Sequence, residues 1–235
     1  MTRRLLLVSN STSRGSGYLD HCAGRLESFL AGASRVLFVP FALHDRVGYA
    51  AKARERLGRL GFEVDSLHAA PDPRRAVGEA EAVFVGGGNT FRLLRDLYAA
   101  DLLAPIRERV DAGVPYVGTS AGTNVACPTV RTTNDMPIVE PPSLASLGLV
   151  PFQINPHFVD ADPASTHQGE TREQRIAEYL EENDGPVVGL RESAMLRVEG
   201  GEVELLGPTG GVLFARGHEP EPLAPGERLD YLLGG

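Results

Sequence analysis

The sequence has 235 residues and a mass of 25.2 kDa, with 31 acidic against 23 basic side chains and a formal net charge of −8. This length suffices for one well-buried domain and is short for two, so we expect a single domain over residues 1–235. An acidic chain is a poor match to general nucleic-acid or anionic-membrane binding, which needs concentrated lysine and arginine. Its apolar runs are only a few residues long, whereas a bilayer-spanning helix needs about 20.

The chain begins with MTRRLLLVSN, a basic pair and a short apolar run that Ser9 and Asn10 end. A secretory signal would need about 7–15 apolar residues and a small-residue cleavage site. The two cysteines, Cys22 and Cys127, make neither a disulfide framework nor a zinc cluster. We therefore expect a first strand, a cytoplasmic location and two reduced thiols.

Up to residue 119, short apolar runs alternate with segments whose apolar residues recur at helical spacing. The predicted strands are Leu5–Val8, Val36–Val39, Val64–Leu67, Ala82–Val85 and Tyr116–Gly118. The predicted helices are Tyr18–Ala31, Val47–Leu60, Arg74–Ala80, Phe91–Tyr98 and Leu102–Ala112. This alternation predicts an α/β fold with a mostly parallel sheet flanked by helices, whose ligands bind at the carboxyl ends of the strands.

The second half of the chain is less regular. Residues 128–165 are rich in proline and asparagine and are predicted to form loops around one short strand, Phe152–Ile154. A helix is predicted over Glu170–Glu182 and a strand over Val187–Leu190. Because Gly200-Gly201 is a strong hairpin turn, we expect a C-terminal antiparallel meander. Its predicted strands are Met195–Val198, Val203–Leu206 and Val212–Ala215.

A G-x-S-x-G pattern occurs where the last of the five early strands ends, at Gly118-Thr119-Ser120-Ala121-Gly122. In a nucleophile elbow such a turn is so tight that small residues must flank the serine, which then projects above the sheet. Ser120 is the candidate nucleophile, and the N–H of Ala121 is a candidate oxyanion donor. The alternative is an ordinary glycine-flanked turn in which the serine caps a helix.

A second glycine-rich loop, Gly86–Thr90, follows the strand Ala82–Val85. It matches neither G-x-G-x-x-G nor the G-K-[ST] of a phosphate-binding loop. Gly88 is the candidate for the second oxyanion N–H, and Asn89 is a candidate substrate contact. A nucleotide-binding loop in a non-catalytic module, or a tight turn alone, stays as the alternative.

A serine nucleophile needs a base and a carboxylate that orients it. Of the six histidines, His157 in QINPHF is preferred, since it follows a predicted strand and Pro156 stiffens its approach. Two acids are candidates for the orienting carboxylate, Asp135 in TTNDMP and Glu192 in LRES. The spacing of the sequence does not choose between them.

Arginines stand out in residues 120–235, which hold seven basic side chains against 18 acidic ones. Arg172 and Arg175, in GETREQR, are three residues apart and so lie on one helix face. A guanidinium can hold a carboxylate through two hydrogen bonds, which makes both arginines candidate substrate-binding residues. The alternative is a solvated pair on an exposed helix.

Six segments of the chain together resemble the S51 family of serine peptidases: LLLVSNST, VGGGNTF, GTSAGTN, CPTVRTTNDMPIV, QINPHF and GETREQR. The resemblance runs through almost the whole chain. It implies a fold like that of class I glutamine amidotransferases and a hydrolase that uses no metal and no cofactor. It also implies that the substrates are dipeptides with an N-terminal aspartate.

Carried over motif by motif, the resemblance makes Ser120 the nucleophile and His157 the base, with the oxyanion N–H groups proposed above. It keeps both Asp135 and Glu192 as candidates for the acid. The chain departs from the family pattern at Arg191-Glu192-Ser193, where Pro-Glu-Gly is expected, and at the residue before the serine, where relatives carry an aromatic side chain.

The implied reaction is acyl transfer through an aspartyl-enzyme, with Arg172 on the aspartate side chain and Arg175 in support. The 128–165 loops are expected to enclose the free amino terminus, with Asn134 or Asp135 as polar partner. A related S51 hydrolase of cyanophycinase-like or isoaspartyl specificity is the main alternative. We expect the protein to be a monomer or homodimer and to bind a small acidic dipeptide as its substrate. We expect it to bind neither nucleic acid nor membranes.

Overall fold

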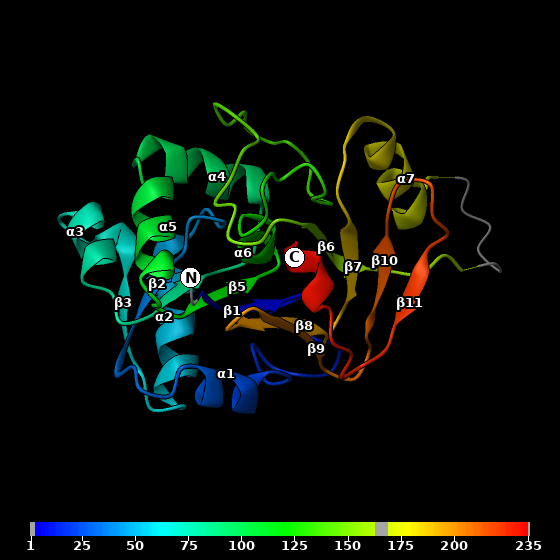
Figure 1. Ribbon diagram of the computed structural model, residues 1–235. Helices are drawn as coiled ribbons and strands as arrows, with labels where there is room; N and C mark the ends of the chain where they lie inside the picture. Colours follow the sequence, from blue (N-terminus) through cyan, green and yellow to red (C-terminus); the bar gives the residue numbers. More distant parts are fainter. Residues whose placement is uncertain (1–2, 163–168, 235) are drawn as a thin grey trace.

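The structure, a computed structural model, describes residues 3–162 and 169–234 (Figure 1). The strands of the larger sheet are β1 (Arg4–Val8), β2 (Arg35–Val39), β3 (Glu63–Ser66), β4 (Val83–Val85), β5 (Tyr116–Thr119), β8 (Met195–Glu199) and β9 (Glu202–Leu206). The strands of the smaller sheet are β6 (Gln153–Phe158), β7 (Val187–Arg191), β10 (Gly211–Phe214) and β11 (Glu221–Leu223).

The described α-helices are α1 (Ala23–Phe29), α2 (Arg46–Gly58), α3 (Pro73–Gly78), α4 (Thr90–Ala99), α5 (Leu103–Asp111), α6 (Ala121–Asn124) and α7 (Arg172–Glu182). Two 3-10 helices, which the sequence patterns did not predict, lie at Leu67–Ala69 and Asp230–Leu233.

The larger sheet has the strand order β3-β2-β4-β5-β1-β8-β9, and its strands from β3 to β1 all run parallel. Strand β1 shows how both faces are covered. Leu5 and Leu7 join the core cluster that includes α4 and α5, whereas Leu6 and Val8 join the cluster that includes α1 and α2. Figure 1 shows these helix pairs on opposite faces. The predicted mixed α/β fold with a mostly parallel sheet flanked by helices is confirmed.

Two helices begin two or more residues later than the periodicity predicts, and local geometry explains both. The helix expected from Tyr18 begins only at Ala23, because Leu19 adopts a left-handed backbone with φ of 58° that no helix can continue. Helix α7 begins at Arg172 because Thr171 caps it, accepting the Gln174 N–H at 3.1 Å in a reciprocal capping box.

The predicted C-terminal meander is wrong in its third strand. Strands β8 and β9 form the expected hairpin, which adds antiparallel to β1 in the larger sheet. Strand β10 instead pairs with β7 and β11 in the smaller sheet. Its Val212 and Phe214 pack with Ile176 and Leu180 of α7, so the strand follows the apolar face of that helix. Alternation identifies a strand but does not identify its neighbour.

The carboxyl ends of the two sheets come together. Strands β4, β5 and β1 are neighbours in the larger sheet, and β6 and β7 run parallel in the smaller one. Their carboxyl ends carry Gly86, Ser120, Ser9, His157 and Glu192, in that order. The fold therefore gathers residues that lie far apart in the sequence at one edge.

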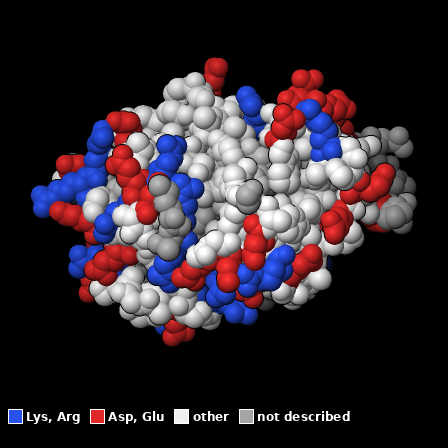
Figure 2. All heavy atoms as spheres, in the orientation of Figure 1, with Lys and Arg blue, Asp and Glu red and all other residues white. Residues whose placement is uncertain are grey.

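On the face that Figure 2 shows, basic side chains alternate with acidic ones, and acidic side chains gather over α7. In residues 3–162 and 169–234, no helix combines the length and the apolar composition that crossing a bilayer requires.

Candidate active site

Ser120 occupies a sharp turn between β5 and α6. Its backbone is strained, with φ of 51° and ψ of −108°, which is uncommon for a residue that is not glycine. The Ser120 N–H donates to the Val8 carbonyl at 3.0 Å, at the carboxyl end of β1. The turn thus presents the serine at the strand ends, as a nucleophile elbow requires.

The two glycines of the G-x-S-x-G pattern are required by close packing. A Cβ on Gly118 would lie 2.5 Å from the Gly122 carbonyl oxygen, and a Cβ on Gly122 would overlap the Val85 carbonyl oxygen. Helix α6 contains only residues 121–124, so we expect individual N–H groups, rather than a long helix dipole, to act on a developing negative charge.

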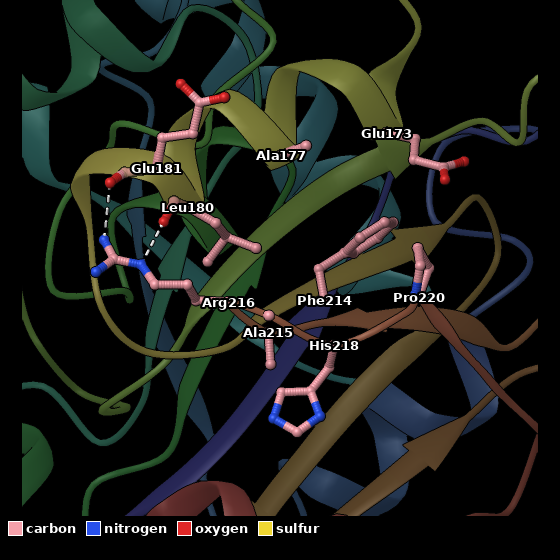
Figure 3. Close-up of a pocket in the computed structure, with 10 residues that line it drawn as sticks. Glu173, Ala177, Leu180, Glu181, Phe214, Ala215, Arg216, His218 and Pro220 are labelled. Atoms are coloured by element: carbon pink, nitrogen blue, oxygen red, sulfur yellow. Dashed lines mark hydrogen bonds between the residues drawn. The ribbon is translucent and has the colours of Figure 1, made fainter.

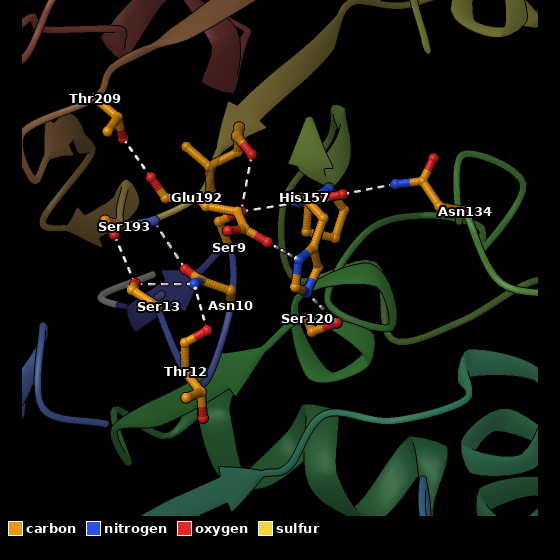
Figure 4. A network of polar contacts seen from close by, with 12 residues as sticks. Ser9, Asn10, Thr12, Ser13, Ser120, Asn134, His157, Glu192, Ser193 and Thr209 are labelled. Atoms are coloured by element: carbon orange, nitrogen blue, oxygen red, sulfur yellow. Dashed lines mark hydrogen bonds and ion pairs between the residues drawn. The ribbon is translucent and has the colours of Figure 1, made fainter. Parts of the chain in front are cut away.

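The imidazole of His157 lies between a serine and a carboxylate. Its Nε2 is 3.1 Å from the Ser120 Oγ, and its Nδ1 is 2.7 Å from the Glu192 Oε1 (Figure 4). A carboxylate beside Nδ1 favours the tautomer with the proton on Nδ1, which leaves Nε2 free to accept the serine proton. The three side chains therefore form a continuous hydrogen-bonded series.

Ser9, which the sequence analysis did not single out, holds the backbone of His157. The His157 N–H donates to the Ser9 Oγ at 2.8 Å, and that hydroxyl donates to the Leu190 carbonyl at 2.8 Å. His157 has a φ of 55°, and the pairing of β6 with β7 shifts register around it. Ser9 directly follows β1 at the carboxyl edge of the sheet, and this position was the sequence signal that could have identified it as a site residue.

Glu192 sits in a turn that the first loop of the chain supports. The Ser193 N–H donates to the Asn10 Oδ1 at 2.8 Å, and the Ser193 Oγ lies 2.7 Å from the Ser13 Oγ (Figure 4). The Thr209 Oγ1 donates to the Glu192 carbonyl at 2.6 Å. Ser193 has a φ of 69°, a left-handed backbone conformation that favours glycine.

Asp135 lies elsewhere in the site, against the amino end of α4. Its Oδ2 accepts the Thr90 N–H at 2.7 Å and the Thr133 hydroxyl at 3.2 Å. Among the described residues, the carboxylate that meets the imidazole of His157 is Glu192. The structure thus separates two acids that sequence spacing could not rank.

The N–H groups of Gly88 and Ala121 are both available at the site. Neither donates a hydrogen bond to another residue in the part of the chain that the structure describes. Gly88 has a φ of 135°, and a Cβ on it would lie 2.6 Å from the Ala42 carbonyl oxygen. Only glycine fits there.

Asn89 and Asn134 are engaged within the chain. Asn89 caps α4 by accepting the Arg92 N–H at 3.0 Å, and its Nδ2 donates to the Met136 carbonyl at 2.9 Å. The Nδ2 of Asn134 donates to the Pro156 carbonyl at 2.7 Å, next to His157. Both amides therefore stabilise the loops around the site.

Arg172 and Arg175 line a hollow of about 430 Å³ at the amino end of α7. Arg175 pairs with Glu170 at 3.3 Å. Burial lowers the pKa of the Arg172 guanidinium, nearby Arg175 lowers it further, and the Asp135 carboxylate raises it. No carboxylate among the described residues lies within ion-pairing distance of Arg172, which leaves its guanidinium available to a ligand.

A larger hollow, of about 500 Å³, lies between α7 and residues 214–220 (Figure 3). Arg216 forms one wall and donates to the Leu180 and Glu181 carbonyls at 2.6 and 3.0 Å. This arginine satisfies carbonyls at the carboxyl end of α7, which are otherwise unpaired in a helix. None of the predicted site residues lines the hollow.

Both cysteines are free and buried. Burial raises the pKa of Cys22 and that of Cys127 to about 12. Their thiols are therefore neutral at ordinary pH and make poor nucleophiles.

Comparison with known proteins matches this sequence to one family. The sequence model of peptidase family S51 matches residues 5–206. A relative from Streptomyces coelicolor named peptidase E is 55% identical over 229 residues, which cover 97% of this chain and 94% of the relative. A relative from Drosophila melanogaster named probable alpha-aspartyl dipeptidase is 50% identical over 234 residues, which cover 98% of each chain.

The fold also matches a solved structure, that of a peptidase from an acI-B1 Actinobacterium. The TM-score is 0.74 at 20% identity, and the match covers 97% of each chain. The family match, the two close relatives and the serine-histidine-glutamate series all point to the same family of serine peptidases. The chain belongs to peptidase family S51.

Proposed function

We propose that this protein is a serine dipeptidase that hydrolyses dipeptides with an N-terminal aspartate. The observation that carries the proposal is the hydrogen-bonded series Ser120–His157–Glu192 on a strained turn. The names of the two close relatives, peptidase E and alpha-aspartyl dipeptidase, support the substrate class.

The reaction is acyl transfer. The Ser120 Oγ attacks the carbonyl carbon of the aspartyl residue while the His157 Nε2 takes its proton. The N–H groups of Gly88 and Ala121 donate to the oxyanion that forms. When the C–N bond breaks, Nε2 returns the proton to the leaving amine. Water, activated by the same imidazole, then splits the aspartyl ester and releases aspartate and free enzyme.

Arg172 binds the side-chain carboxylate of the substrate aspartate. Arg172 has no carboxylate partner among the described residues, whereas Arg175 pairs with Glu170. Asp135 lies close enough to raise the Arg172 pKa, and its carboxylate receives the ammonium group of the substrate. Together they would bind the two charged groups that only an N-terminal aspartate carries.

Arg172→Ala is expected to lower kcat/KM for Asp-Leu by roughly 30-fold, since removing one partner of a partly desolvated ion pair costs about 2 kcal/mol or more. Arg175→Ala serves as the matched control and is expected to have a smaller effect. Steady-state kinetics on Asp-Leu measures both. Unchanged kcat/KM in Arg172→Ala would contradict the assignment of Arg172.

A substrate panel tests the function itself. Wild-type enzyme is expected to cleave Asp-Leu and to leave the β-aspartyl isomer and Glu-Leu essentially intact. The reason is that both alternatives move the second carboxylate relative to the scissile carbonyl. Product amino acids are measured by chromatography. Preferential cleavage of the β-aspartyl isomer would instead assign an isoaspartyl hydrolase.

The finer organisation belongs to the same proposal. We propose a single domain, because one hydrophobic cluster contains residues of both sheets. We also propose a class I glutamine amidotransferase-like topology, which the family resemblance implies. A cytoplasmic location, catalysis without a metal or cofactor, absence of nucleic-acid binding and a monomeric or homodimeric state stay predictions.

A further inference from the structure

A further hollow, which does not contain Arg172, lies beside the candidate nucleophile Ser120. It has a volume of about 340 Å³, within the range of about 300–1,000 Å³ typical of ligand pockets. Residues of α2 and of the first loop line it, together with Gly87 and Gly88. No residue is shared with the hollow that contains Arg172.

The glycine loop is the common wall between this hollow and Ser120. A Cβ on Gly87 would lie 3.1 Å from the Ser120 Cβ, so this loop contacts the serine directly. Gly88, next along the loop, carries the proposed oxyanion N–H. A substrate carbonyl held there therefore has the hollow beside it. Since the aspartyl side chain is assigned to Arg172 on another wall, the leaving residue is the part left to fill this hollow.

The walls of the hollow are mostly apolar. Tyr18 and Tyr49 are 8% and 6% exposed, and their rings meet edge to face with centroids 6.2 Å apart. Tyr49 is held against the loop, since a Cβ on Gly86 would lie 2.6 Å from its hydroxyl oxygen. Leu43 adds an aliphatic surface that is 38% exposed. Such walls suit an apolar side chain.

One cation lines this hollow. The Nζ of Lys52 lies 4.7 Å from the centroid of the Tyr18 ring, an arrangement that attracts a cation to the ring face. In the described part of the chain, no carboxylate lies within ion-pairing distance of Lys52. Asp45 also lines the hollow, but it caps α2 and accepts the Gly48 N–H at 2.8 Å. Lys52 is thus a surface ammonium without a counter-ion, beside apolar walls.

We propose that this hollow receives the leaving residue of the dipeptide and that Lys52 pairs with its free α-carboxylate. The inference rests on the proposed function and extends it to the second residue. This hollow would select dipeptides whose second residue is apolar and carries a free α-carboxylate. A longer peptide or an amide has no negative charge at that position.

The test compares kcat/KM for Asp-Leu and for its carboxamide, Asp-Leu-NH₂. Wild type is expected to prefer the free acid by about tenfold, which corresponds to about 1.4 kcal/mol. Lys52→Met is expected to bring this ratio close to one, mainly by lowering kcat/KM for Asp-Leu. Lys52→Arg is expected to retain most of the preference for the free acid. Because the pair is exposed, the wild-type preference is also expected to shrink at high salt.

Arg54→Met is the matched control, because it removes one charge from the same helix at a side chain that lies outside this hollow. It is expected to leave the acid-to-amide ratio at the wild-type value. An equal fall in Arg54→Met and Lys52→Met would assign the effect to general electrostatic steering and overturn the proposal. So would a Lys52→Met ratio equal to that of wild type.

Chemical modification gives a second, independent measurement. Lys52 is the only lysine in the sequence, so acetylation at this position can be quantified by mass spectrometry apart from the terminal amine. Acetylated wild type is expected to lose the same preference for the acid. If wild type cleaves neither substrate, the proposed function itself fails. If it cleaves both and neither the variant nor the modification changes the ratio, only the Lys52 assignment fails.

Discussion

Ser120→Ala is expected to lower kcat for Asp-Leu by about 10⁴–10⁶-fold, because removing a nucleophile leaves only transition-state binding by the rest of the site. The substitution removes the Oγ that lies 3.1 Å from the His157 Nε2. The fold should survive, since the Ser120 N–H bond to Val8 involves the backbone alone. Steady-state kinetics and labelling by a fluorophosphonate probe measure the loss.

A folded Ser120→Ala variant that retained both probe labelling and hydrolysis would refute the role of Ser120 as nucleophile. Circular dichroism establishes folding in the same preparation. Ser143→Ala is a suitable control, because that serine is exposed and its hydroxyl oxygen accepts only the nearby Ala145 N–H. It is expected to behave as wild type.

Glu192→Gln is expected to lower kcat by about 10²–10⁴-fold. A glutamine at this position can present its N–H₂ to Nδ1, which favours the tautomer with the proton on Nε2 and blocks the base. The carboxylate it replaces lies 2.7 Å from Nδ1 and is about half exposed, so water moderates the effect.

Asp135→Asn provides the comparison and is expected to act mainly on KM. An asparagine oxygen can still accept the Thr90 N–H, so α4 stays capped, but the negative charge proposed to face the substrate ammonium is lost. Separate kcat and KM values distinguish the two variants. A large loss of kcat in Asp135→Asn with little change in Glu192→Gln would exchange the proposed roles of the two acids.

The identity of the acid shows where sequence reasoning stops. Asp135 and Glu192 both lie in polar segments near the predicted site, and the distance along the chain from His157 does not favour either. The choice depends on how the smaller sheet places the end of β7 beside the end of β6. It also depends on contacts that Ser193 makes with Asn10 and Ser13, about 180 positions away.

The same limit explains the wrong strand assignment. The alternation within Val212–Ala215 is a correct signal for a strand, because side-chain period two is a local property. Its partner depends on which apolar surface is free, and β10 packs beside α7 rather than beside β9. Lys52 is similar: its sequence context is an ordinary helix, and only folding places it beside the glycine loop.

The sequence by itself determined the features that arise within a few residues. Helical and strand periodicity determined the parallel half, and the local steric demand at Gly118 against Gly122 determined the turn that presents Ser120. Tertiary structure decided which side chains meet there, namely His157 with Glu192 and with the supporting Ser9. It also formed the hollows lined by Arg172 and by Lys52. The physical reason is that backbone geometry is set locally, whereas contacts between distant segments follow from sheet pairing and core packing. The net charge of −8 illustrates the difference, since an average charge argues against broad polyanion binding but does not decide whether a few placed cations hold an acidic ligand.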